Sequence, residues 1–139
     1  MVHALEEATR VLKPGGLLVD LRPAVVHRKV GILHGGRLQS IGHLQEDFSL
    51  DRAADAAWKR FTRPETFRVV QRRSFPCNRY LDSLAAFREF LDEFIEEGQS
   101  RVAARKLLNR VGRAWSEAAG PKRIVITAPL RLTAMQRRR

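Results

Sequence analysis

The stretch ALEEATRVLKPGGLLV, residues 4–19, decides the expected fold. Apolar residues recur through its first part at Ala4, Leu5, Ala8, Val11 and Leu12. This spacing is typical of one face of a helix, so it predicts a short amphipathic helix over residues 3–12. Pro14 and the two glycines after it end the helix and let the chain reverse. The apolar run at residues 17–21 then predicts a strand that helices cover on both faces.

The same stretch resembles a pattern of Rossmann-like S-adenosylmethionine-dependent methyltransferases, in which a helix, the turn R-V-L-K-P-G-G and the fifth strand follow one another. Downstream the resemblance covers architecture only. A strand near Phe67 and a last strand near Arg123 would correspond to the family's closing antiparallel pair. Two features depart from the family pattern: a hairpin is inserted after the fifth strand, and two helices separate the last two strands. The two helices leave the pairing of the last two strands open.

We therefore expect an α/β fold: an incomplete Rossmann-like methyltransferase sheet, made of the downstream strands, with an inserted β-hairpin and a helical hairpin. The resemblance implies that the family's cofactor-binding residues lie upstream of the matching segment. No catalytic, cofactor-binding or metal residue is therefore assigned to this chain. We expect it to bind S-adenosylmethionine and to be active only when a partner chain or an upstream segment supplies the missing half. The chain would then be a gene fragment, the product of a mis-assigned start, or a stand-alone subunit.

The middle of the chain predicts a hairpin and a helix. Two β-like stretches between residues 28 and 44 flank Gly35 and Gly36, which suit a tight turn. These glycines cannot replace a nucleotide-binding loop, because no helix follows them at the required spacing. Asp47 or Ser49 is expected to cap a helix that ends near Thr62 and turns Leu50 inward.

The second half predicts a strand, a helical hairpin and a final strand. Residues 67–75 read as a strand, and Asp82 or Ser83 should cap a helix with an apolar stripe and an acidic flank. A second amphipathic helix is expected over residues 100–118. The last strand begins at Arg123, with a frayed basic tail at residues 136–139.

Composition sets the class of protein. A chain of 139 residues with 44% hydrophobic residues fits a single domain, which we expect to span residues 1–139. A single cysteine, Cys77, excludes an internal disulfide, and the acidic N-terminal residues do not resemble a signal peptide. We therefore expect a cytoplasmic protein without a membrane partner, and we interpret Cys77 as structural.

The net charge of +11 is concentrated at one end of the chain. Through Glu97 there are 15 basic and 14 acidic residues, whereas from Gly98 onward there are 11 basic residues and one acidic residue. We favour a basic helix complemented by its acidic neighbour. The alternative is a non-catalytic module that binds nucleic acid. That alternative would use Arg101, Arg105, Arg110, Arg113, Lys122 and Arg123.

The remaining expectations concern the first strand. Asp20 and Arg22 end it on the side where open α/β sheets bind ligands, so they are the candidate substrate or ligand residues. A surface ion pair is an equally good interpretation. With the upstream half missing, this strand would have one unpaired edge. We expect the inserted hairpin, a second copy of the chain or a partner subunit to cover it, and rank a homo-oligomer first.

Overall fold

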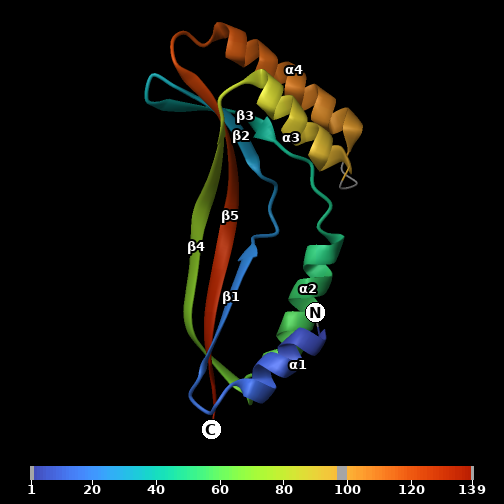
Figure 1. Cartoon of the computed structure of the whole chain (residues 1–139), viewed down its shortest axis with the longest axis vertical. Coiled ribbons are helices and arrows are strands. Elements are labelled where there is room, and N and C mark those ends of the chain that lie inside the picture. The colour runs from blue at the N-terminus through green and yellow to red at the C-terminus, as the bar shows by residue number, and fades with distance from the viewer. Residues whose placement is uncertain (1, 97–99, 139) are drawn as a thin grey trace. The chain divides into compact units, whose positions relative to one another are not determined.

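The computed structural model describes residues 2–96 and 100–138, whose contacts form two compact units. Unit 1 comprises the described residues of Met1–Val25, Phe48–Phe75 and Pro129–Arg139, and unit 2 those of Val26–Asp47 and Pro76–Ala128. Two long strands, β4 (Phe67–Leu81) and β5 (Lys122–Arg137), contribute residues to both units (Figure 1). The described chain is therefore mixed α/β, with an open antiparallel sheet of five strands.

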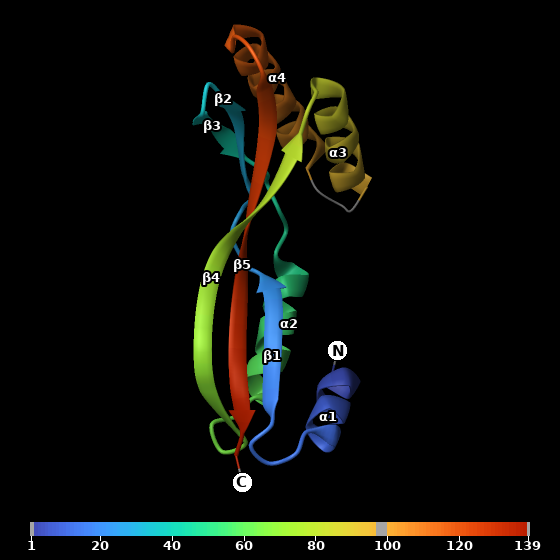
Figure 2. The same cartoon turned by 60° about the vertical axis from the view of Figure 1, so that its left-hand side comes forward.

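Unit 1 contains two helices and three neighbouring strands. They are α1 (Val2–Val11), α2 (Ser49–Phe61), β1 (Leu17–Pro23), the end of β5 and the start of β4. The end of β5 runs antiparallel to β1, and β4 also pairs with β5 (Figure 2). Gly15, at φ +83°, supplies the left-handed turn between α1 and β1. The predicted order of helix, glycine turn and strand is therefore confirmed. The pairing of the last two strands, which the sequence left open, does form between β4 and β5.

One face of β1 is bare, contrary to the expectation that both faces are covered. Leu17, Val19 and Leu21 are 56%, 57% and 54% exposed. The intervening Asp20 is buried, because alternate residues of a strand point to opposite faces and its face lies toward α2. β1 also ends the strand order, so its second edge pairs with no strand among the described residues. The apolar run correctly predicted a strand, but the prediction that helices cover both of its faces is wrong for the described residues.

Three details of unit 1 differ from the predictions. Phe48 occupies the N-cap position of α2 without a side-chain capping bond, where Asp47 or Ser49 was expected. Leu50, expected to face inward, is 83% exposed. β5 continues through Arg137, whose backbone N–H donates to Gly16 O at 2.9 Å. Gln136 and Arg137 of the expected tail therefore belong to the sheet.

Unit 2 contains the predicted β-hairpin and helical hairpin. Its elements are β2 (Lys29–His34), β3 (Arg37–His43), α3 (Leu84–Glu96) and α4 (Arg101–Glu117), together with the start of β5 and the end of β4. Gly35 and Gly36 have positive φ and form the expected turn between β2 and β3. The other edge of β2 pairs antiparallel with β5, where Ile32 lies opposite Ile124.

The core of unit 2 lies between its sheet and the two helices. Phe87 of α3, Val111 of α4 and Ile32 of β2 are each 0% exposed. The Oγ atoms of Ser83 and Ser100 accept hydrogen bonds from the backbone N–H groups of Ala86 and Ala103. Of the two caps expected for α3, Asp82 or Ser83, the structure has Ser83, and the cap at Ser100 was not predicted. Both helices form as their apolar stripes predict.

β4 is longer than predicted and continues past Phe75 to Leu81. All side chains from Arg68 to Tyr80 are exposed, and among the described strands β4 pairs with β5 alone. Pro76 lacks a backbone N–H and is tolerated in such an edge strand. No helix in the described residues is long and apolar enough to cross a bilayer.

Candidate functional site

An ion-pair network joins β1, β5 and α2 within unit 1. Arg22 Nε lies 2.8 Å from Asp20 Oδ2, and Arg22 Nη1 lies 2.7 Å from Asp55 Oδ1. The same Asp55 oxygen lies 2.8 Å from Arg131 Nη2. Arg22 also places its guanidinium 5.3 Å from the ring centre of Trp58. Two carboxylates and two guanidinium groups thus balance one another between the sheet and α2.

Strand register explains why these residues meet. Arg22 lies directly opposite Arg131 in the antiparallel pair of β1 and β5, and opposite residues point to the same face. Two guanidinium groups side by side repel each other, and Asp55 of α2 compensates by accepting from both. Asp20 and Arg22 were identified in the sequence, but Asp55 and Arg131 were not, because 76 residues separate them along the chain.

A cavity of about 390 Å³ lies beside this network. Apolar groups and hydroxyls line part of it, while its charged residues are mainly cationic. Lys59 and Arg72 have no ion-pair partner among the described residues, whereas the cavity's one acidic residue, Asp55, is already paired with arginines. The cavity therefore suits a small anion. Its lining consists of Arg22, Asp55, Trp58, Lys59, Thr62, Val69, Arg72, Arg131, Thr133 and Met135.

The cavity beside the ion-pair network does not favour the sulfonium of S-adenosylmethionine. The cofactor carries a positively charged sulfonium, which the cationic lining of this cavity would repel. Gly35 and Gly36 are exposed in the turn between β2 and β3, so they do not precede a helix that could hold a nucleotide. No step of a methyl transfer is therefore assigned to these residues.

Asp20 and Arg22, the predicted ligand residues, lie together and form an ion pair with each other. Asp20 is 9% exposed, and Arg22 is held by two carboxylates and faces Trp58. The ion-pair interpretation therefore describes their local contacts. Any ligand near them would meet the free cations Lys59 and Arg72 in the same cavity.

Three of the six predicted nucleic-acid residues make contacts within unit 2. Arg110 donates to the backbone oxygen of Ile41. Lys122 Nζ donates to the backbone oxygens of Trp115 and Ala118, both at 2.6 Å, at the end of α4. Arg123 pairs with Asp82 at 2.7 Å. These three side chains are therefore already engaged by the protein.

Arg101, Arg105 and Arg113 are the other three predicted nucleic-acid residues. They are exposed on α4 and line hollows between α3 and α4. We expected the acidic flank of α3 to complement them, but no ion pair joins the two helices in the part of the chain that the structure describes. Any complementation between the two helices therefore does not take the form of direct ion pairs among the side chains that the structure describes.

The histidines and the cysteine do not gather into a site. His27 Nδ1 accepts from the backbone N–H of Glu46 at 3.1 Å, while His34 and His43 occupy the two ends of the hairpin register. Within residues 2–96 and 100–138, no three His, Cys, Asp or Glu side chains are placed to hold a metal ion. Cys77, which was expected to be structural, is exposed on β4 and does not pack in the core.

Comparison of the chain with models of protein families, with curated proteins and with solved structures found no match.

Proposed function

We propose that this chain is the sheet-completing, C-terminal part of a Rossmann-like methyltransferase. In this proposal β1, β4 and β5 are the last strands of the enzyme's sheet. A separate S-adenosylmethionine-binding half, on another segment or another chain, pairs with the second edge of β1. The chain by itself neither binds the cofactor nor transfers a methyl group.

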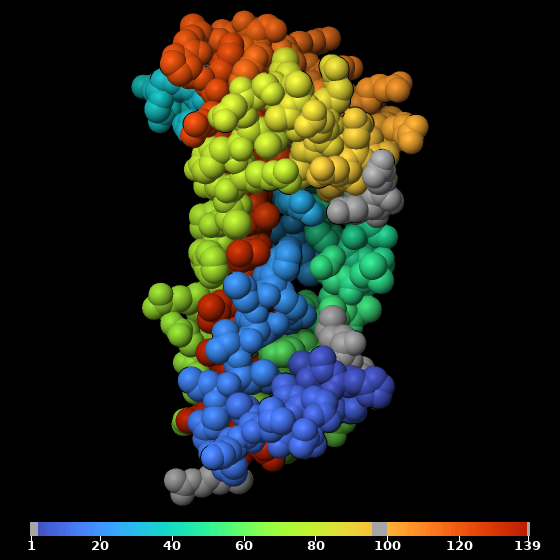
Figure 3. All heavy atoms as spheres, in the orientation of Figure 1, coloured from blue at the N-terminus to red at the C-terminus, as the bar shows by residue number. Residues whose placement is uncertain are grey.

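The bare surface of β1 carries this proposal. Leu17, Val19 and Leu21 expose more than half of their area on one face, and the second edge of the strand has no partner among the described residues. In Figure 3, atoms of β1, in blue, and of β5, in red, lie at the surface. An apolar strand with an open edge and an open face is a template for pairing with another strand. A sheet that continues beyond β1 would use both features.

Two further features support the methyltransferase assignment. The segment that resembles the family forms α1, a glycine turn at Gly15 and β1 in the expected order. β4 and β5 pair with each other, as the family's closing antiparallel pair would. Each of these two features occurs in other α/β proteins. They support the methyltransferase assignment because they occur together with the R-V-L-K-P-G-G segment.

In the absence of the missing half, we propose that the surface of β1 is covered by a second copy of the chain. The β2–β3 hairpin, another candidate, is already paired with β5 and packed on α4. A homo-oligomer or a complex with a partner subunit would bury the exposed side chains of Leu17, Val19 and Leu21.

Calorimetry with S-adenosylmethionine tests the proposal. The chain of 139 residues should release no binding heat. The same chain, extended upstream through any continuous reading frame, should bind the cofactor at micromolar concentration. Val19→Lys in the extended protein should weaken binding, because a lysine on the exposed face of β1 opposes burial of that face by the other half.

Two results would contradict the proposal. One is saturable binding of the cofactor by the 139-residue chain alone. The other is an upstream reading frame without a glycine-rich first strand, together with no co-purifying subunit that binds the cofactor.

A further inference from the structure

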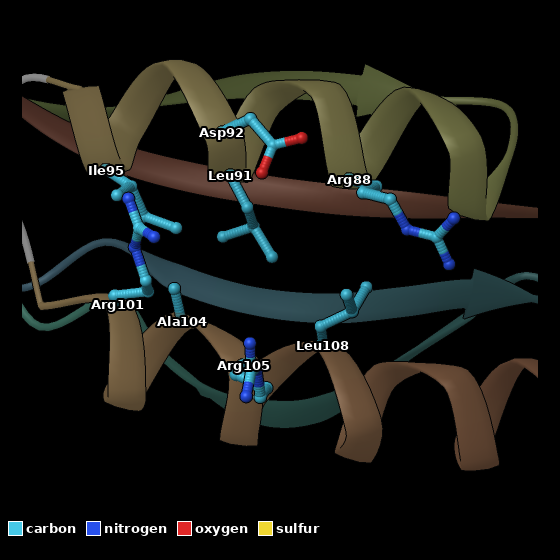
Figure 4. Close-up of a pocket in the computed structure, with 8 residues that line it drawn as sticks. All are labelled: Arg88, Leu91, Asp92, Ile95, Arg101, Ala104, Arg105 and Leu108. Carbon is cyan, nitrogen blue, oxygen red and sulfur yellow. The ribbon is translucent and has the colours of Figure 1, made fainter.

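A groove runs along the seam between α3 and α4 in unit 2. One hollow in this seam has a volume of about 480 Å³, and α3 and α4 both contribute side chains to it (Figure 4). Leu91 and Ala104 at its base are 3% and 4% exposed, so they also belong to the core of the unit. The apolar part of the lining consists of Leu91, Ile95, Ala104 and Leu108.

A second hollow extends the groove along the same two helices. It has a volume of about 410 Å³ and shares Arg88 and Leu108 with the first. On α4 the combined lining extends from Arg101 to Arg113. At 1.5 Å per residue this distance is about 18 Å, the length of roughly three helical turns.

Arginines from both helices border the apolar base. Arg88 comes from α3, and Arg101 and Arg105 come from α4 (Figure 4). Arg113 lies farther along α4 in the second hollow. None of these four has an ion-pair partner among the described residues, and Asp92 is the one acidic residue in either lining. Within the two linings, arginines therefore outnumber acidic residues by four to one above an apolar base.

We propose that this groove binds an acidic amphipathic helix of a partner protein. Apolar side chains at helical spacing would enter between α3 and α4, and glutamates or aspartates on both flanks would meet the arginines. A guanidinium group binds a carboxylate through two parallel hydrogen bonds, which favours arginine at such borders. Helices commonly bind in apolar grooves of this kind through residues at i, i+3, i+4 and i+7.

The lining favours this occupant over nucleic acid. The phosphate backbone would use the arginines but gain nothing from Leu91, Ala104 and Leu108 at the base. No aromatic side chain lines either hollow, so bases would find no stacking partner there. The proposal concerns unit 2 alone and does not depend on the methyltransferase assignment.

Fluorescence anisotropy on the full chain tests the proposal. The probe is a labelled, side-chain-stapled helix of 16 residues with leucines at i, i+3, i+4 and i+7 and glutamates elsewhere. A second peptide has the same composition and staple but a shuffled order. The test variant is Arg105→Glu, and the matched control is Lys106→Glu, an exposed neighbour on α4 that lines neither hollow.

The expected result is saturable binding of the amphipathic helix and at least about fivefold weaker binding of the shuffled one. Arg105→Glu should weaken binding by about fivefold or more, because a negative charge on α4 then faces the glutamates of the peptide. Lys106→Glu should change it by less than about twofold. Both variants should retain the circular dichroism spectrum of the parent chain.

The opposite results would overturn the proposal. They are absence of saturable binding up to about 1 mM peptide, equal binding of the two peptides, or equal losses in the two variants. Displacement of the helix by a DNA duplex at lower concentration would assign the groove to nucleic acid instead. A chain that forms a dimer which Arg105→Glu dissociates would assign it to a second copy.

Discussion

Asp55 on α2 lies 2.7 Å from Arg22 on β1, and the same carboxylate oxygen lies 2.8 Å from Arg131 on β5. Two adjacent strands and the helix above them thus share one acidic group. The side chains of Arg22 and Asp55 are 20% and 22% exposed, so water screens this contact less than it screens an ion pair on the open surface.

Removing the charge of Asp55 should destabilise unit 1. In Asp55→Asn the amide cannot neutralise two guanidinium groups, so the free energy of unfolding should fall by about 1–2 kcal/mol. Urea unfolding followed by circular dichroism measures the difference. Glu65→Gln removes the same charge from an exposed residue that has no ion-pair partner in the part of the chain that the structure describes, and should change stability by less than about 0.5 kcal/mol. Equal losses in both variants would mean that the network adds no local stability.

Placing a charge on the bare face of β1 should reduce self-association. Val19 is 57% exposed, so Val19→Lys should leave folding stability within about 0.5 kcal/mol while making a buried interface unfavourable. Sedimentation velocity over a range of concentrations should show the parent chain associating and the variant remaining monomeric. Val102→Lys, at an exposed valine of α4, is the matched control and should associate as the parent does. A parent chain that is monomeric throughout contradicts the prediction.

Two glycines of unit 2 should respond in opposite directions to alanine. A Cβ atom at Gly31 would lie 2.6 Å from the backbone oxygen of Gln39, where the register of β2 and β3 shifts. Gly31→Ala should therefore lower the free energy of unfolding by about 1–3 kcal/mol. Gly112, inside α4, has open space around the added atom, so Gly112→Ala should raise stability by about 0.5–1 kcal/mol. Thermal unfolding of the two variants would refute this account if both shifts had the same sign.

The core of unit 2 should be sensitive to substitutions that exposed apolar residues tolerate. Phe87 is 0% exposed, so Phe87→Leu should leave unfilled volume and lower stability by about 1–2 kcal/mol. Leu50 is 83% exposed, and Leu50→Ala should change stability by less than about 0.5 kcal/mol. Chemical denaturation provides both values. A larger loss at Leu50 would indicate that α2 packs against another surface in solution.

Local sequence patterns predicted where the helices and strands lie better than they predicted which faces of those elements are covered. The stripe of α3 and the serine at its N-terminus both act within one or two helical turns, and both were identified in the sequence. Leu50 fits the same periodicity as the inward residues of α2 but lies in solvent. Periodicity shows which residues share a face, whereas coverage of that face depends on other segments.

The candidate site shows the same division. Asp20 and Arg22 are two residues apart on one strand, and alternation alone places them on the same face. Asp55, Trp58 and Arg131 join them only because the register of β5 and the position of α2 bring distant segments together. No short-range pattern marks such residues.

The sequence by itself determined the α/β class, the helices, the hairpin at Gly35 and Gly36, and the turn between α1 and β1. Backbone preference, side-chain periodicity and turn chemistry act over a few residues, so they can be read directly along the chain. Only the tertiary structure decided the antiparallel order of the strands, the bare face of β1, the pairing of Asp55 with two arginines and the groove between α3 and α4. These features are set by contacts between segments that are far apart in sequence, because burial and charge pairing depend on which surfaces meet in space.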